Sequence, residues 1–165
     1  MNFKILIKPL LVLFVLLFSF SCDKGSIFSE NYFSVKINQV SGEFEPYNVK
    51  VQNGAIVLAA KLVDNSRTES VVITVKGDRP GKYKQIFDYK TGVSVTSCGL
   101  SYKITQKGSK GEPGYFTSYE GEVEISDIDY SAEELSGSYT FLVKSFEKDS
   151  VINEVKGEFL NVDFQ

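Results

Sequence analysis

The segment that decides the fold is Tyr47–Val63, with the sequence YNVKVQNGAIVLAAKLV. Apolar and polar residues alternate up to Val51, which is typical of a strand with one face toward a core. Asn53-Gly54 favours a two-residue hairpin turn, because both of its positions require positive φ. The returning segment Ala55–Val63 begins with six apolar residues, a pattern that predicts a strand covered on both faces at the centre of a sheet. The segment therefore predicts antiparallel β-structure.

The same alternation continues on both sides of this hairpin. Segments rich in Val, Ile, Thr, Tyr and Phe are separated by Gly, Asn, Asp or Pro, as in antiparallel β proteins. The further strands expected are Tyr32–Gln39, Glu69–Lys76, Tyr83–Tyr89, Val93–Gln106, Tyr115–Ser126, Gly137–Glu147 and Val151–Asp163. Turns are expected at Asp64–Arg67, Gly77–Gly81 and Asp127–Ser136, and the longest loop at Lys107–Gly114. We expect an all-β domain, a single antiparallel β-sandwich or flattened barrel of roughly eight to ten strands.

The N-terminal segment has the three parts of an export signal. Lys4 and Lys8 precede an apolar stretch, which ends in small residues just before Cys22. A helix over the apolar part is only about 18 Å long, against a hydrocarbon core of roughly 30 Å. The cysteine after the small residues resembles a lipobox, in which the thiol is acylated and the leader is removed. The alternative is an uncleaved anchor helix over Phe3–Ser21.

The leader and the cysteine divide the chain into three expected regions. We expect a lipoprotein signal peptide over residues 1–21, the lipidated Cys22 with a polar tether over residues 22–31, and one β-domain over residues 32–165. Two or three acyl chains hold a protein on a membrane almost permanently, since each buried methylene contributes about 0.8 kcal/mol. The membrane is thus an expected partner through the acyl chains on Cys22.

Charge and composition exclude several function classes. The chain has 18 Lys and Arg and 21 Asp and Glu; without Lys4 and Lys8, 16 basic residues remain and the mature net charge is −5. Nucleic-acid binding is disfavoured, because it needs a basic surface. Histidine is absent, which excludes Ser-His and Cys-His nucleophile pairs and histidine-containing zinc sites. With Cys22 acylated, Cys98 has no disulfide partner, and we expect it to be a buried apolar side chain.

Motifs at the start, in the middle and toward the end of the domain resemble an uncharacterised family of Bacteroidota-type lipoproteins, described only as a domain of unknown function. The motifs are Phe33-x-Val35-x-Ile37-Asn38, Gly81-Lys82-Tyr83, Gly121-x-Val123-x-Ile125, Leu135-x-Gly137-x-Tyr139-x-Phe141 and Val155-x-Gly157-x-Phe159. The resemblance covers nearly the whole mature chain and implies a lipid-anchored, all-β protein of the cell envelope. It supplies no active-site residues. Members have a glycine soon after the first strand, whereas Gln39-Val40 precede Gly42 here, so a longer first turn is expected.

Tyr115 and Tyr119 form the candidate ligand surface. They lie on the same face of one predicted strand, beside the glycine-rich loop Lys107–Gly114, where their rings can stack on a sugar or a peptide. The alternative is a cross-strand aromatic pair that stiffens the hairpin.

Two groups of acids are further candidates. The turn Asp127–Glu134 carries four carboxylates, and calcium binds six to eight oxygens; the alternative is a capping box formed by Ser131 and Glu134. Glycoside hydrolysis needs two acids roughly 5 to 10 Å apart, which Glu112, Glu120, Glu122 and Glu124 can supply in principle. Alternating acids along one strand are more typical of the water-facing side of a sheet.

Together these features predict a lipid-anchored β-domain of the cell envelope, on the outer membrane, with a non-catalytic binding or structural role. We expect no enzyme activity, no cofactor and no metal. The alternatives are an accessory glycan-binding lipoprotein and, third, a carboxylate-dependent hydrolase. The ligand, the oligomeric state and the face of the outer membrane are left open by the sequence.

Overall fold

The protein is described by a computed structural model, which covers residues 31–88, 93–108, 114–145 and 152–165. Within these ranges the chain forms eleven strands and no helix. The strands are β1 (Tyr32–Ile37), β2 (Val40–Glu43), β3 (Glu45–Gln52), β4 (Ala55–Val63), β5 (Arg67–Val75), β6 (Gly81–Asp88), β7 (Val93–Thr96), β8 (Cys98–Gln106), β9 (Gly114–Asp129), β10 (Glu134–Ser145) and β11 (Ile152–Asp163). The predicted all-β class is confirmed, with slightly more strands than expected because β2 and β7 are short additional elements.

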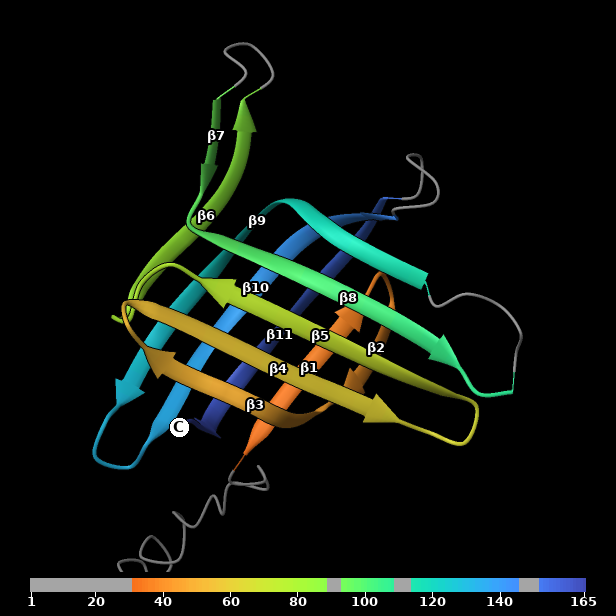
Figure 1. The fold of residues 1–165 in the computed structure, drawn as a ribbon, viewed down its shortest axis with the longest axis horizontal. Coiled ribbons are helices and arrows are strands. Elements are labelled where there is room, and N and C mark those ends of the chain that lie inside the picture. The colour runs from red at the N-terminus through yellow and green to blue at the C-terminus, as the bar shows by residue number, and fades with distance from the viewer. Residues whose placement is uncertain (1–30, 89–92, 109–113, 146–151) are drawn as a thin grey trace, which may run out of the picture.

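A single antiparallel sheet curls into a half-barrel (Figure 1). Its order is β2-β1-β11-β10-β9-β8-β5-β4-β3, and β6 and β7 branch from β9. Consecutive strands are mostly neighbours, as expected when short turns join antiparallel strands. The first and last strands of this order, β2 and β3, are separated in the chain by one residue, Phe44. The chain therefore passes from one end of the curled sheet to the other at Phe44.

The central hairpin has the predicted turn. Asn53 and Gly54 have φ values of 55° and 72°, and Gln52 pairs with Ala55, as in a two-residue turn with positive φ at both positions. The first hairpin is equally tight, since Ile37 pairs with Val40. The expected longer first turn is therefore wrong.

The position predicted for Ala55–Val63 is also wrong. This segment forms β4 with the expected bounds, but β4 lies next to the terminal strand β3 instead of at the sheet centre. Ile56, Leu58 and Ala60 are buried on the inner face, and on the outer face Ala59 is also buried and Val57 is half-buried. The apolar run therefore reflects partial cover of both faces and does not specify which strands lie beside it.

Two other predicted boundaries change in the structure. The segment Val93–Gln106 is divided at Ser97 into β7 and β8, because the chain changes its pairing partner there. The turn expected over Asp127–Ser136 is confined to Tyr130–Glu133, and its flanking residues extend β9 and β10. Tyr89 and Val151, expected at strand ends, lie outside the described residues.

Strand β9 has two different neighbours along one edge. Its first half pairs with β8, from Gly114 to Thr117, and its second half pairs with β6, from Gly121 to Ile125. Side chains replace the backbone ladder where β8 and β6 diverge: the Ser118 hydroxyl donates to Gln85 Oε1 at 2.5 Å and accepts the Leu100 amide at 2.8 Å. Ser118 is 7% exposed, so these bonds satisfy polar groups that would otherwise be buried without partners.

Glycines and aromatic residues face each other directly across β9, β10 and β11. The three cross-strand pairs are Gly121 with Phe141, Gly157 with Tyr139, and Gly137 with Phe159. A Cβ atom on any of these glycines would meet the aromatic side chain of its partner and a backbone carbonyl at impossible distances. The rings thus occupy the space left by the missing side chains, an arrangement known from sheets that bend at glycine.

The inner face of the half-barrel is the core. Fully buried side chains from β1, β4, β5, β9, β10 and β11 meet there, including Phe33, Phe141 and Phe159. The Phe33 ring stacks on Phe159 with centroids 6.0 Å apart. Each such phenylalanine contributes about 1.5–3 kcal/mol by leaving water. Phe159 lies on the last strand, which pairs with both β1 and β10, so the C-terminal strand is integral to the core.

We predict that Gly157→Ala destabilises the domain by about 1–3 kcal/mol or more, as overpacked sites do. The Tyr139 hydroxyl crosses Gly157 to donate to the Ser34 carbonyl at 2.8 Å, and a Cβ at Gly157 would lie 2.7 Å from that hydroxyl. Urea unfolding of wild type and variant measures the change in the free energy of unfolding. Gly42→Ala is the matched control, because its Cβ meets its nearest neighbour, Leu62, at an ordinary 3.5 Å. Equal stability of the two variants would contradict the role of the glycine–aromatic pairs.

Candidate binding surfaces

A groove lies along the seam where the two ends of the sheet approach each other. It has a volume of about 710 Å³, within the range of small-molecule sites. We call it the seam groove; its lining residues are Asn31, Glu43–Val49 and Asp163–Gln165. It therefore combines the start of the described chain, the passage from β2 to β3, and the C-terminal residues.

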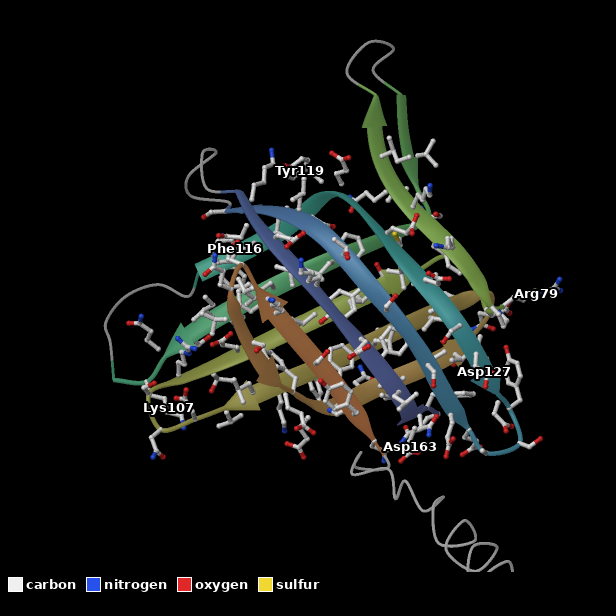
Figure 2. The ribbon with its side chains drawn as sticks, turned by 180° about the vertical axis from the view of Figure 1, so that it is seen from behind. Arg79, Lys107, Phe116, Tyr119, Asp127 and Asp163 are labelled. Carbon is white, nitrogen blue, oxygen red and sulfur yellow. The ribbon has the colours of Figure 1, made fainter. Side chains whose placement is uncertain are left out.

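Backbone and side-chain hydrogen bonds hold the two walls of the seam groove together. The Phe44 amide donates to the Phe33 carbonyl at 2.8 Å, and the Gln165 amide donates to the Val49 carbonyl at 3.0 Å. The Asn31 side chain donates to Asp163 Oδ2 at 3.0 Å. Figure 2 shows Asp163 beside the N-terminal end of β1. These bonds connect the two walls of the groove, although no strand ladder joins β2 to β3 among the described residues.

Tyr47 is exposed in this groove because β3 has a bulge. Pro46 pairs with Ala60 and Asn48 pairs with Ala59, which leaves Tyr47 as the additional residue. A bulge redirects the side chains around it, and Tyr47 is 52% exposed. The Lys61 ammonium lies 5.7 Å from the centre of the Tyr47 ring. The Tyr47 ring is therefore partly open to solvent and has the Lys61 ammonium over one face.

The charges around the seam groove are mainly acidic. Glu43, Glu45 and Asp163 are exposed on its lining, and Lys61 lies 3.9 Å from Glu45. Carboxylates accept hydrogen bonds from hydroxyl and ammonium groups. A ligand rich in hydroxyl or amino groups fits this combination of an aromatic ring and carboxylates.

Tyr115 and Tyr119 have different surroundings in the structure. Tyr115 is 45% exposed, and the Lys103 ammonium from the opposite residue of β8 lies 5.1 Å from its ring centre. Tyr119 is half-buried and occupies a bulge, since Ser118 pairs with Val143 and Glu120 with Leu142. Figure 2 shows Tyr119 where β9 bends. The two tyrosines therefore belong to one strand but differ in exposure and setting.

The acidic turn Asp127–Glu134 is held by Asp129. Its carboxylate accepts the amides of Ser131 at 2.7 Å and Ala132 at 3.0 Å, and these backbone bonds hold the pKa of Asp129 below its ordinary value of 3.8. The cap is therefore supplied by Asp129 and not by Ser131, as a capping box would require. Within the described residues, which include this whole turn, no three acidic or cysteine side chains gather closely enough to hold a metal ion.

Glu122 and Glu124 are neutralised by lysines on β6. Lys84 lies 3.4 Å from Glu122 and Lys82 lies 3.0 Å from Glu124, and each pair is directly opposite in the register. The hydrogen bond to Glu124, followed by the charge of that carboxylate, raises the pKa of Lys82 above its ordinary value of 10.5. Glu120 is exposed, and Glu112 lies outside the described residues. The arrangement is that of a charged outer face of a sheet.

A buried polar network inside the half-barrel is not among the sites predicted from the sequence. Glu69 is only 4% exposed; it accepts a hydrogen bond from the Tyr102 hydroxyl and lies 2.6 Å from the Arg67 Nε. Burial, followed by the hydrogen bond to Glu69, raises the pKa of Tyr102 well above its ordinary value of 10. Glu69 alternates along β5 with the buried Val71 and Ile73, so its inward position could have been predicted from the sequence. The sequence does not indicate that Tyr102 and Arg67 are its partners.

The structure tests the prediction for one of the two cysteines. Cys98 is buried as predicted, at 2% exposure, and burial raises the pKa of its thiol to about 11. Its thiol donates to the Tyr83 carbonyl at 3.1 Å. Cys22, the predicted site of acylation, lies outside the described residues. Within the described ranges, no helix is long and apolar enough to cross a bilayer.

Comparison with known families matches residues 29–163 to a family described as "Domain of unknown function (DUF6252)". This match covers the whole half-barrel, from β1 to β11. The chain belongs to the DUF6252 family. No curated protein matches the chain, and no solved structure matches it. The predicted resemblance to a domain of unknown function is therefore confirmed.

We predict that Tyr102→Phe destabilises the domain by about 1–3 kcal/mol, because the buried Glu69 carboxylate loses a hydrogen-bond donor. Thermal and urea unfolding at neutral pH measure the change. Tyr115→Phe is the control: it removes the same hydroxyl from an exposed tyrosine and should leave the free energy of unfolding unchanged. If both variants unfold as the wild type does, the Glu69 network does not contribute to stability.

Proposed function

We propose that this DUF6252 protein is a lipid-anchored binding module of the cell envelope, attached to the outer membrane through Cys22, and that it acts without catalysis. The seam groove is its ligand site. The observation that carries the proposal is this groove of about 710 Å³, with the exposed Tyr47 among its lining residues. A rigid scaffold that presents an aromatic ring and several hydrogen-bond acceptors is suited to recognition.

The position of the groove supports tethering as part of the function. Asn31, the last residue of the predicted tether, lies in the groove lining. Nine peptide units separate Asn31 from Cys22, so an extended tether reaches about 30 Å at 3.3–3.6 Å per residue. An acylated Cys22 would keep the groove within that distance of the membrane surface. The ligand would accordingly be found near the membrane.

The second hypothesis is a glycan-binding lipoprotein, and the exposed Tyr47 favours a glycan as the ligand. Saccharide rings stack on exposed aromatic side chains, and their hydroxyl groups donate to carboxylates such as Glu43 and Glu45. The third hypothesis, a two-carboxylate hydrolase, needs two convergent acids. Within the described ranges the buried carboxylate is Glu69, and it is paired with Arg67 and Tyr102. A binding function therefore agrees better with the geometry than hydrolysis does.

Lipidation is tested on the native full-length protein. We predict that mass spectrometry finds the chain beginning at Cys22 with acyl groups attached, and that detergent is needed to release it from membranes. Cys22→Ala should abolish acylation and membrane attachment through it. Cys98→Ala is the matched control and should remain attached, because Cys98 is a buried residue of the domain. Native protein with an unmodified Cys22 and residues 1–21 still in place would overturn the anchor.

Ligand binding is tested with a glycan array followed by titration of the saccharides that bind. We predict that Tyr47→Ala weakens binding about two- to tenfold, which corresponds to the typical 0.5–1.5 kcal/mol of an aromatic contact. Tyr115→Ala is the control, since it removes another exposed tyrosine far from the groove. Loss of binding with Tyr115→Ala alone would move the site to the surface of β8 and β9. Absence of any bound saccharide would exclude the glycan candidate and leave other ligands of the groove.

A further inference from the structure

Part of the lining of the seam groove belongs to no strand. Phe164 and Gln165 follow β11 and line the groove. The Gln165 amide donates to the Val49 carbonyl of β3, so these two residues cross the seam from one end of the curled sheet to the other. We call Phe164 and Gln165 the seam strap. A segment outside a strand ladder opens readily unless other groups hold it, so the contacts of the seam strap decide the shape of this wall.

The turn between β9 and β10 holds the seam strap through two contacts. The Phe164 amide donates to the Glu133 carbonyl at 2.8 Å. The Tyr130 ring lies edge-on to the Phe164 ring, with centroids 5.8 Å apart and an interplanar angle of 81°, a geometry that aromatic pairs prefer. Figure 1 shows this turn beside the C-terminus. Neither Tyr130 nor Glu133 is among the residues that line the groove, so the turn acts on the groove from outside.

Tyr130 is itself held on two sides. The Asp129 carboxylate accepts the amides of Ser131 and Ala132, and these bonds fix the backbone of the turn. At the other end of the side chain, the Tyr130 hydroxyl donates to the Asp78 carbonyl at 2.7 Å, in the connection between β5 and β6. Tyr130 is 60% exposed. Its ring is therefore oriented by these contacts and not by burial in the core.

We propose that Tyr130 is a positioning residue of the seam groove: its ring holds Phe164 in place, and with it the seam strap that closes the seam. This role rests on the proposed function, because a ligand of the groove would meet a wall set by the seam strap. Tyr130 contacts the seam strap and the β5–β6 connection at once. A change in either turn is therefore transmitted to the wall of the groove, without any contact between Tyr130 and the ligand.

Amide hydrogen exchange of the full-length protein in detergent tests this role without any ligand. The Gln165 amide exchanges when its bond to Val49 opens, so its rate reports how often the seam strap is released. Tyr130→Ala should speed this exchange about two- to tenfold, as expected when an aromatic pair is lost. Tyr130→Phe should speed it less, since the ring remains and only the bond to Asp78 is lost. Tyr115→Ala, at another exposed tyrosine, is the matched control and should leave the rate unchanged.

The outcomes separate a local positioning role from a general loss of stability. Faster Gln165 exchange in Tyr130→Ala, with the amides of the core strand β5 exchanging as in wild type, supports the proposal. An unchanged Gln165 rate, an equal rise throughout β5, or a Tyr130→Phe variant as fast as Tyr130→Ala would each overturn it. The measurement is independent of the glycan array. Failure of the positioning role therefore leaves the groove as the ligand site, and the absence of a bound saccharide leaves the role of Tyr130 in place.

Discussion

The curvature of the sheet depends on three glycines that lie opposite aromatic rings on β9, β10 and β11. The pairs are Gly121 with Phe141, Gly157 with Tyr139, and Gly137 with Phe159. Each ring fills the space of a missing side chain, so the strands approach closely and the sheet bends around its own core. The Tyr139 hydroxyl extends this arrangement across Gly157 to the Ser34 carbonyl of β1. One repeated contact thus joins four neighbouring strands.

A curled sheet that ends in two separate strands has a seam, and the seam groove lies there. Phe44 alone connects β2 to β3, and the last residues of the chain reach β3 through the hydrogen bond from Gln165 to Val49. These contacts hold the two ends close without merging them into one ladder. The groove between them is therefore a consequence of the curvature, and its Tyr47 ring is exposed by the bulge of β3.

Much of the fold was predictable because it depends on neighbours in the sequence. Asn53-Gly54 specifies a tight turn, and the strand Ala55–Val63 has the predicted bounds. Its place in the sheet was predicted wrongly, because an apolar run does not say which strands flank it. The buried polar network shows the same limit. Glu69 follows the inward alternation of β5, but its partner Tyr102 comes from β8. Alternation identifies a face of a strand and says nothing about the residue opposite.

By itself the sequence determined the all-β class, most strand positions, and the burial of Cys98, because alternation, turn residues and apolar character act within a few residues. Only the tertiary structure decided the half-barrel, the seam groove and the branching of β6 from β9. These features depend on contacts between distant segments, such as Asn31 with Asp163 and Gln85 with Ser118. The physical reason is that strand pairing is made by backbone groups that every residue except proline possesses, so local sequence specifies a strand but not its partner.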